Sequence, residues 1–342
     1  MFENLKIFII YYSFKLYHFF NLNIFLFIIN YLGGPLFTKM LQTFFNLNDV
    51  NTNDTLSGSI GSVTIKKYLV IKNLHDNIDI KLENSLNILN IFLKNNKIPF
   101  PFYFNEFRDI NKKQVNLDLE KNYSIELSQI FKNISNVQVI DIFFSNKNYH
   151  YSKLINGFRI DEFLIKYPQF KNEIFYNLYL SFYLMLSKNI FHCDWHFGNF
   201  LVNLDKNNQI VLYILDTGLM GKLDNKLHYE KMIDMFKINL LYLEPINIIK
   251  FLSFINLEPK ATLSNFIKES KNINKLKINY SKKLILILKN ATNNKLKFPI
   301  VILYMIQGII FMEKFSINKD LKNLKIFSEK MGFTSEIVKT IT

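Results

Sequence analysis

The sequence is short of cysteine, and this limits the ways in which the chain can be stabilised. Cys193 is the only cysteine among 342 residues, so no disulfide can form within the chain. A single thiol is more typical of a reducing compartment than of a disulfide-stabilised secreted domain. Hydrophobic residues make up 49% of the chain, which excludes a disordered protein. A chain of this length can form two lobes, each with its own core.

Long apolar runs are also missing, although residues 4–33 are rich in hydrophobic side chains. The longest uninterrupted run is Ile24–Ile29, whereas a helix that spans a bilayer needs about 20 apolar residues. The sequence before Gly33 and Gly34 has no small-residue cleavage site of the kind that follows a signal peptide. We therefore expect a helix that lies on a membrane or packs in the core, with a transmembrane span as the alternative.

Acidic residues are too few to balance the basic ones, and the net charge is +14. Such a charge favours anionic partners, which include lipid surfaces, nucleotides and nucleic acids. The lysines are spread along the chain, and no Lys/Arg block or nucleic-acid-binding module is present, so nucleic acid is not an expected partner. Together with the apolar N-terminal region, the charge predicts an anionic membrane surface or lipid as a partner and a peripheral membrane location.

The polar residues most typical of a catalytic site stand around two apolar stretches in the middle of the chain. Asp194 is followed by Asn199, by apolar stretches at Phe200–Asn203 and Val211–Leu215, and by Asp216. The two stretches read as a hairpin, which would bring Asn199 and Asp216 to the same end. Phosphoryl transfer needs a carboxylate near the attacking oxygen and oxygen ligands for Mg²⁺. Asp194 fits the first role, and Asn199 with Asp216 fits the second.

Two other interpretations apply to this region. His192, Cys193, Asp194 and His196 are all possible zinc ligands, but a second ligand pair of the kind found in structural zinc sites is missing from the sequence. Alternatively, the polar side chains of the loop and hairpin simply satisfy turns.

A turn of small residues precedes a strand that carries a lysine. The turn contains Ser57, Gly58, Ser59 and Gly61, and Lys72 follows an apolar strand. Backbone N–H groups in such a turn can approach phosphates closely because no large side chains intervene. Lys72 could reach the same phosphates. The alternative is an ordinary β-turn.

Helical patterns surround these segments. An amphipathic helix is predicted for Lys81–Lys97, and a second helix runs from Gln114 to about residue 133, with Glu120 beside its buried stripe. At the edge of the core, Glu120 either pairs with a positively charged side chain or is solvated. A helix over residues 36–45 carries Lys39 and Gln42 three positions apart on a shared face.

The remaining pattern alternates strands with helices and then becomes helical. Val137–Phe144 and Tyr149–Leu154 read as strands, and a long helix is predicted from Phe170 to Lys188. After Gly221 we expect helices to the end of the chain.

Five short segments share the pattern of one protein family, and the resemblance covers about residues 31–315. They are Gly34–Gln42, Val70–Lys72, Gln114–Asn122, His192–Asn199 and Leu215–Gly221. Together they resemble the UbiB family of atypical protein-kinase-like proteins (the aarF-domain-containing kinases). The first segment is similar to the family's Lys-x-Gly-Gln helix and its Gly-Pro lead-in. Other kinase-like phosphotransferases share the Asp-Asn-Asp pattern but not this helix.

The resemblance implies an α+β, bilobal protein-kinase-like fold. Residues 1–55 would form a helical extension, residues 56–155 a small β-containing N-lobe, and residues 156–342 a mainly helical C-lobe. The helix of Lys39 and Gln42 would fold over the nucleotide pocket and restrain protein phosphorylation.

The resemblance also implies the cofactors and the roles of the site residues. ATP or ADP with Mg²⁺ would bind, and the activity would be that of an ATPase or an unusual kinase at a membrane. Lys72 would contact phosphates, Glu120 would hold Lys72, Asp194 would be the catalytic carboxylate, and Asn199 and Asp216 would bind the metal. Cellular relatives often act in ubiquinone or other isoprenoid-lipid metabolism.

The chain departs from the family pattern at several positions, and these keep other functions open. Leu41 replaces a glycine, Asn116 an acidic residue and Thr217 a phenylalanine. A nucleotide-binding scaffold without catalysis is therefore one alternative, and a small-molecule phosphotransferase is another.

Overall fold

The computed structural model describes most of the central part of the chain. The described residues are 7–13, 32, 60–95, 100, 102–222, 260–278, 280–300, 303, 304, 307, 308, 311, 326, 329 and 330. Within these ranges no helix is both long and apolar enough to cross a membrane. The predicted helix at residues 36–45 and most of residues 4–33 lie outside the described residues.

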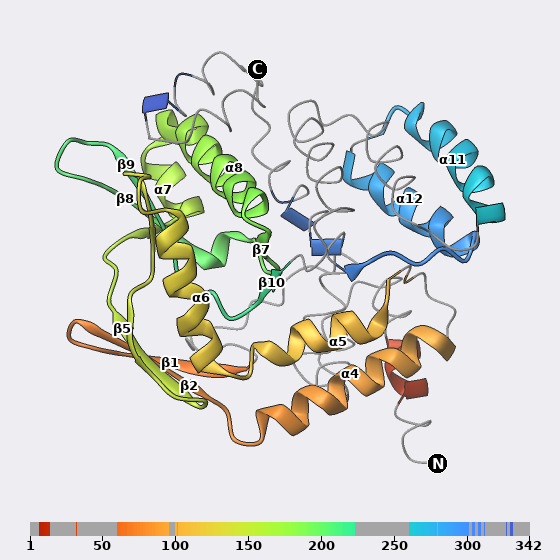
Figure 1. Cartoon of the computed structure of the whole chain (residues 1–342), viewed down its shortest axis with the longest axis horizontal. Helices are drawn as coiled ribbons and strands as arrows, with labels where there is room; N and C mark the ends of the chain where they lie inside the picture. Colours follow the sequence, from red (N-terminus) through yellow and green to blue (C-terminus); the bar gives the residue numbers. More distant parts are fainter. Residues whose placement is uncertain are drawn as a thin grey trace.

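The first sheet contains four antiparallel strands in the order β1-β2-β5-β4, and it lies against helix α6 (Figure 1). The strands are β1 (Gly61–Lys66), β2 (Leu69–Leu74), β4 (Ile142–Ser145) and β5 (Tyr149–Lys153). In the register, Lys72 pairs with Val63 on one side and with His150 on the other. Side chains alternate along each strand, so these three residues share one face of the sheet.

Helices α4 (Ile78–Asn95), α5 (Phe104–Lys113) and α6 (Leu117–Ile130) connect β2 to the next strands. The predicted helix from Gln114 begins three positions later, because the side chain of Asn116 accepts a hydrogen bond from the Asp118 amide and caps the helix. Glu120 lies one turn inside α6 on its buried side.

The second sheet has the strand order β3-β9-β8-β6. Its strands are β3 (Val137–Val139), β6 (Phe158–Arg159), β8 (Phe200–Leu204) and β9 (Ile210–Ile214), and β7 (Ile190–His192) pairs separately with β10 (Met220–Lys222). The expected hairpin is confirmed, since β8 and β9 pair in antiparallel register from Phe200 and Ile214 to Leu204 and Ile210.

The expectation of one strand over Val137–Phe144 is wrong, because this stretch divides between the two sheets. Its first half is β3, which pairs in parallel with β9, and its second half is β4, which pairs with β5. Between them the Ile140 amide still donates to the Ile214 carbonyl. The chain therefore crosses from the second sheet to the first within two residues, at Ile140 and Asp141. The predicted boundary at residues 155 and 156 falls between β5 and β6.

The other helices of the second part are α7 (Ile160–Lys166), α8 (Lys171–Ser187), α11 (Lys260–Asn274) and α12 (Tyr280–Asn293), with short 3-10 turns at Pro168–Phe170 and Phe197–Asn199. The described residues after Gly221 are mainly helical, as predicted, although β10 extends to Lys222.

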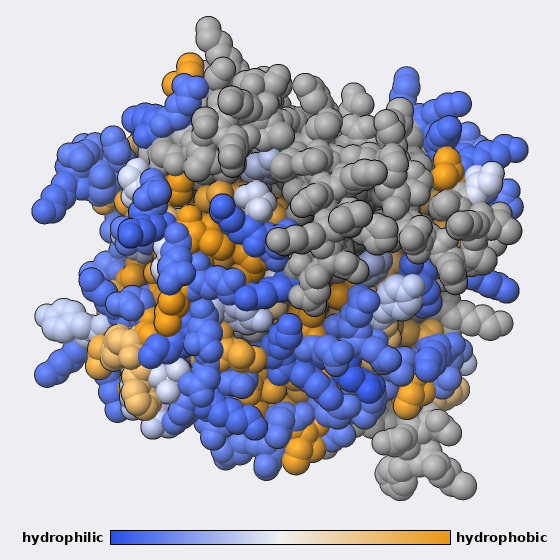
Figure 2. All heavy atoms as spheres, in the orientation of Figure 1, coloured by the Kyte–Doolittle hydropathy of each residue, from blue (hydrophilic) through white to orange (hydrophobic). Residues whose placement is uncertain are grey.

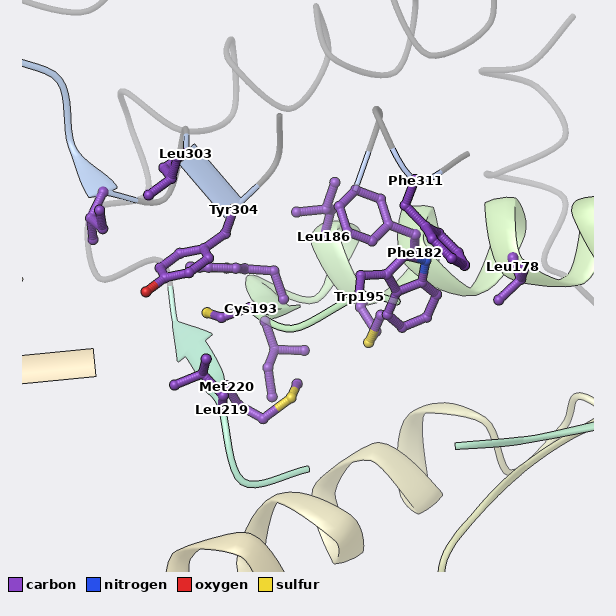
Figure 3. Close-up of a cluster of buried hydrophobic side chains, with 14 of the residues drawn as sticks. Leu178, Phe182, Leu186, Cys193, Trp195, Leu219, Met220, Leu303, Tyr304 and Phe311 are labelled. Atoms are coloured by element: carbon purple, nitrogen blue, oxygen red, sulfur yellow. The ribbon is translucent and has the colours of Figure 1, made fainter. Parts of the chain in front are cut away.

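Helix α8 and the loop after β7 enclose an aromatic cluster (Figure 3). The Trp195 ring lies 4.6 Å from the Phe200 ring and 5.5 Å from the Phe182 ring, and Phe311 stacks on Phe200 at 6.3 Å. All four side chains are buried. Such rings each bury a large apolar area and pack in defined orientations. The packing of Trp195 in this cluster therefore stabilises the loop that carries Asp194.

Hydrophilic side chains cover most of the described surface on the face drawn in Figure 2, with hydrophobic atoms exposed over the first sheet. Phe143 and Phe144 are 50% and 44% exposed on this sheet, and both rings lie against Tyr151. Tyr68, in the turn between β1 and β2, is 83% exposed.

Truncating the centre of the aromatic cluster should strongly destabilise the fold. We expect Phe200→Ala to lower the free energy of unfolding by about 3–5 kcal/mol, since a fully buried ring is lost and a cavity remains. Ile165→Ala removes a side chain that is 85% exposed and should change stability by no more than about 0.5 kcal/mol. Urea unfolding followed by circular dichroism measures both. Equal stability of the two variants would show that the cluster does not support the fold.

Candidate functional site

The Lys72 ammonium joins three parts of the chain that are distant in sequence. Its Nζ lies 2.9 and 2.8 Å from the two carboxylate oxygens of Glu120 and 3.1 Å from Oδ2 of Asp216. Lys72 comes from β2, Glu120 from α6 and Asp216 from the loop after β9. The Glu120 side chain is 1% exposed and that of Asp216 is 39% exposed. The ion pair between Lys72 and Glu120 that the resemblance implied is thus present, while the catalytic role of each residue stays a prediction.

The loop after β9 is held against α6 by its own residues. The Thr217 hydroxyl donates a hydrogen bond of 2.8 Å to the Glu120 carbonyl, and the Gly218 amide donates one of 2.8 Å to Oδ1 of Asp216. A Cβ at Gly218 would lie 3.1 Å from that same Oδ1 and 3.2 Å from Oε2 of Glu120, so a side chain would crowd both carboxylates. Thr217, which replaces the family's phenylalanine, therefore links Asp216 to α6 by a polar bond.

His192 ties the Asp194 loop to Asp216. Its Nε2 lies 2.6 Å from the Asp216 carbonyl oxygen, and its Nδ1 accepts a hydrogen bond of 3.1 Å from the Asp194 amide. An acceptor at Nδ1 and a carbonyl at Nε2 require the neutral ring with its hydrogen on Nε2. On the exposed side of the loop, Nε2 of His196 lies 3.3 Å from Oδ2 of Asp194.

Asn199 and Asp216 stand together at one end of the hairpin, as predicted. The Leu215 amide donates to the Asn199 carbonyl at 3.0 Å, one step beyond the pairing of β8 with β9. The side-chain nitrogen Nδ2 of Asn199 donates a hydrogen bond to the Asp194 carbonyl at 2.7 Å. The side-chain oxygen of Asn199 is therefore the atom able to bind a cation. One carboxylate and one amide oxygen are the hard ligands that Mg²⁺ prefers, so the residues fit this ion.

The zinc alternative finds no support in the described residues, where no three His, Cys, Asp or Glu side chains cluster as a metal site would require. Cys193 points into the apolar cluster of Figure 3 and is 3% exposed. Burial raises the pKa of its thiol well above the usual value, whereas zinc binds the thiolate.

The charges of the site stabilise one another. Burial alone would raise the pKa of the Asp216 carboxyl, but the Lys72 ammonium and the Gly218 amide lower it to about 2, from an ordinary value of 3.8. Burial alone would lower the pKa of Lys72, but the charges of Asp216 and Glu120 raise it instead. The stabilisation from a lowered carboxyl pKa is fully present above pH 3.8 and is lost as the pH falls through about 2. Burial lowers the pKa of His192, although the hydrogen bond to the Asp216 carbonyl acts in the opposite direction. The lowered pKa favours the neutral ring.

The predicted nucleotide loop and the Lys-x-x-Gln helix are only partly described. Gly61 begins β1, and a Cβ at this position would lie 2.3 Å from the Asn73 carbonyl oxygen, so glycine permits the close pairing of β1 with β2. The other predicted nucleotide contacts, which are Ser57, Gly58, Ser59, Lys39 and Gln42, lie outside the described residues, and their roles stay predictions.

His150 belongs to the site but was not among the residues expected from the sequence. It is 2% exposed, lies opposite Lys72 in the sheet, and places Nε2 3.5 Å from Oε1 of Glu120. The available signal was the alternation of the strand predicted at 149–154, which alone could not show that β5 pairs with β2.

The architecture and the site agree with a match to one family model. The description of that model is "ABC1 atypical kinase-like domain", and it matches residues 60–241. The chain belongs to this family. The matched region includes Lys72, Glu120, Asp194, Asn199 and Asp216, and the family prediction made from the motifs is confirmed. A search of the curated proteins found no match.

Three solved structures are similar to this ABC1 protein at low identity. The complex of Rv3197 with erythromycin from Mycobacterium tuberculosis has 15% identity and a TM-score of 0.42, and the match covers 81% of this chain and 76% of that one. The Rio2 kinase–ADP/Mg²⁺–phosphoaspartate complex from Chaetomium thermophilum has 11% identity and a TM-score of 0.29, with 76% and 77% covered. WbdD bound to the kinase inhibitor LY294002 has 10% identity and a TM-score of 0.28, with 69% and 44% covered. The scores are low, so the family assignment depends on the family model. The fold is α+β, bilobal and kinase-like.

Removing the Lys72 ammonium should leave a buried carboxylate without its cation. We expect Lys72→Met to lower the free energy of unfolding at neutral pH by about 3–5 kcal/mol. The double variant Lys72→Met/Glu120→Gln should recover most of this loss because it removes the charge left alone. Lys153→Met, at an exposed lysine of the same sheet, is the control and should stay within about 0.5 kcal/mol of the native protein. Urea unfolding measures all four proteins, and a Lys72→Met protein of native stability would contradict the expectation.

Proposed function

We propose that this protein binds Mg–ATP or Mg–ADP and acts as an atypical phosphotransferase or ATPase at a membrane. The observation that carries the proposal is the joint position of Lys72, Glu120 and Asp216, with Asp194 attached to the same centre through His192. These residues come from the first sheet, from α6 and from the loops after β7 and β9. Their grouping supports the proposal because phosphoryl transfer requires positioning and charge stabilisation from a protein.

Each side chain has a distinct task in this proposal. Lys72 contacts the phosphates, and Glu120 holds Lys72 in place from the buried side. Asn199 and Asp216 supply oxygen atoms to Mg²⁺, which when bound would neutralise charge on the phosphates. Asp194 orients the attacking hydroxyl or water and accepts its proton. His192 fixes the backbone of Asp194 relative to that of Asp216, so the carboxylate and the metal ligand keep a constant separation.

The segments with Ser57, Gly58, Ser59 and Gly61 and with Lys39 and Gln42 complete the proposed nucleotide site. The small-residue turn covers the phosphates with backbone amides. The helix of Lys39 and Gln42 folds over the pocket and restrains protein phosphorylation, as the family resemblance implies.

Three features support the membrane part of the proposal. The net charge is +14, Phe143, Phe144 and Tyr68 are exposed on the first sheet, and Lys66 and Lys67 stand beside Tyr68 in exposed positions. Aromatic side chains next to basic ones suit the interface of an anionic bilayer. By family resemblance, the process served would be isoprenoid-quinone or other lipid metabolism.

Two other functions remain to be compared with this one. A nucleotide-binding scaffold without catalysis is motivated by Leu41, Asn116 and Thr217, which depart from the family pattern. A small-molecule phosphotransferase would use Asp194, Asn199 and Asp216 in the same way but would not need Lys39 and Gln42.

Nucleotide binding should raise the thermal stability of the protein, and this is the first test. Mg–ATP or Mg–ADP at about 100 times its Kd should stabilise the folded state by about 2.7 kcal/mol. We expect the shift to disappear without Mg²⁺ and in Asp216→Asn. Asp161→Asn, an exposed carboxylate of α7, is the control and should keep the shift. Differential scanning fluorimetry in detergent measures it, and no shift with either nucleotide would refute the proposed site.

Turnover separates the enzyme from the scaffold. Asp194→Asn should keep the Mg-nucleotide shift and lose turnover by about a hundredfold or more, since a positioned general base contributes at least this much. Phosphate release measured with a coupled assay follows the reaction. A native protein that binds nucleotide and has no turnover would favour the scaffold.

Lys39→Ala separates the proposed function from a small-molecule phosphotransferase. If the helix of Lys39 and Gln42 folds over the pocket, this variant should change the rate of turnover or the choice of acceptor. Full native activity of Lys39→Ala toward a small-molecule acceptor would favour the phosphotransferase instead.

A further inference from the structure

His150 is a buried polar side chain that the proposed mechanism leaves without a task. It lies on β5, it is 2% exposed, and its Nε2 is 3.5 Å from Oε1 of Glu120. Neither ring nitrogen has a hydrogen-bond partner among the residues that the structure describes. A buried polar group without a partner costs free energy, so an unpaired imidazole beside a buried carboxylate requires an explanation.

The sheet register directs His150 and Lys72 to the same carboxylate. The two residues are opposite each other on the antiparallel strands β5 and β2, and opposite residues place their side chains on the same face. The Lys72 ammonium contacts both oxygens of Glu120, and the imidazole lies just beyond contact with one of them. Glu120 therefore faces two nitrogen donors from adjacent strands.

The Lys72 ammonium has no hydrogen left for a phosphate in this arrangement. An ammonium group has three N–H donors, and here two point to Glu120 and one to Asp216. Lys72 can bind a phosphate only if it gives up one of these bonds. A bond lost at Asp216 can be replaced, because this carboxylate is partly exposed and is a proposed metal ligand. A bond lost at Glu120 cannot be replaced by water, because Glu120 is 1% exposed.

We propose that His150 is a positioning residue, which donates a hydrogen bond from Nε2 to Glu120 when the Lys72 ammonium turns toward bound phosphates. This inference rests on the proposed function. The nitrogen and oxygen would close from 3.5 Å to the usual distance of about 2.8 Å for a bond to a carboxylate. A ring with its hydrogen on Nε2 can donate this bond. Glu120 then keeps its orientation while its first partner is shared with the nucleotide.

Two variants of His150 with amide side chains test the inference. The amide nitrogen of glutamine can take the place of Nε2, whereas that of asparagine reaches only as far as Nδ1. We expect His150→Asn to weaken Mg–ADP binding about tenfold or more, because a hydrogen bond to a charged group is lost. His150→Gln should bind within about threefold of the native protein. Isothermal titration calorimetry on the full chain measures each affinity.

Ser152→Ala is the matched control. Ser152 lies two positions further along the same face of β5, it is 0% exposed, and its hydroxyl also has no partner among the described residues. Its removal should leave Mg–ADP affinity unchanged. Equal losses in His150→Asn and His150→Gln, or no loss in either, would overturn the inference, because neither result depends on the reach of the donor.

A double-mutant cycle on Mg–ADP affinity tests the contact in the bound state. The affinities of Glu120→Gln, His150→Asn and the double variant give the coupling between the two side chains. Additive losses, with coupling within the error of the measurement, would overturn the inference. If the native protein binds neither nucleotide, the proposed function fails; if it binds Mg–ADP without this coupling, only the role of His150 fails.

Discussion

The structure depends on one ammonium group that is shared between two carboxylates. Lys72 is contributed by the first sheet, whereas Glu120 belongs to α6 and Asp216 to the loop after the second sheet. Burying a carboxylate as deeply as Glu120 is costly unless a cation lies beside it. The shared ammonium therefore restrains three elements of the fold at once.

The Asp194 loop is positioned by different means, which are aromatic packing and backbone hydrogen bonds. Trp195 anchors the loop in the cluster formed by Phe182, Phe200 and Phe311. His192 links this loop to Asp216, because its Nδ1 accepts a hydrogen bond from the Asp194 amide and its Nε2 lies within hydrogen-bond distance of the Asp216 carbonyl oxygen. A chain without a disulfide thus places its acidic residues by combining a rigid apolar support with a few directional polar bonds.

The sequence was sufficient to predict the parts of the site that depend on local patterns. The β8–β9 hairpin and the position of Asn199 beside Asp216 followed from two apolar stretches and a polar turn, and the pairing of Lys72 with Glu120 was implied by the family motifs. Contacts across the sheet could not be predicted in this way. The division of residues 137–144 between two sheets depends on a parallel pairing with β9, and the place of His150 depends on a register that only the folded protein fixes.

The crossing of the chain at Ile140 and Asp141 has a mechanical consequence. Helix α6 precedes this crossing and is bonded to the first sheet, since the Lys121 ammonium donates to the Phe143 carbonyl at 3.1 Å and the Ser145 hydroxyl donates to Oδ1 of Asp118 at 2.6 Å. The Thr217 hydroxyl, from the loop after the second sheet, binds the Glu120 carbonyl. If the two sheets rotate relative to each other, α6 and Lys72 move together with the first sheet, and the movement is concentrated at the bonds that Thr217 and Asp216 make with them. The geometry between Asp194 and Asp216 is preserved in such a movement.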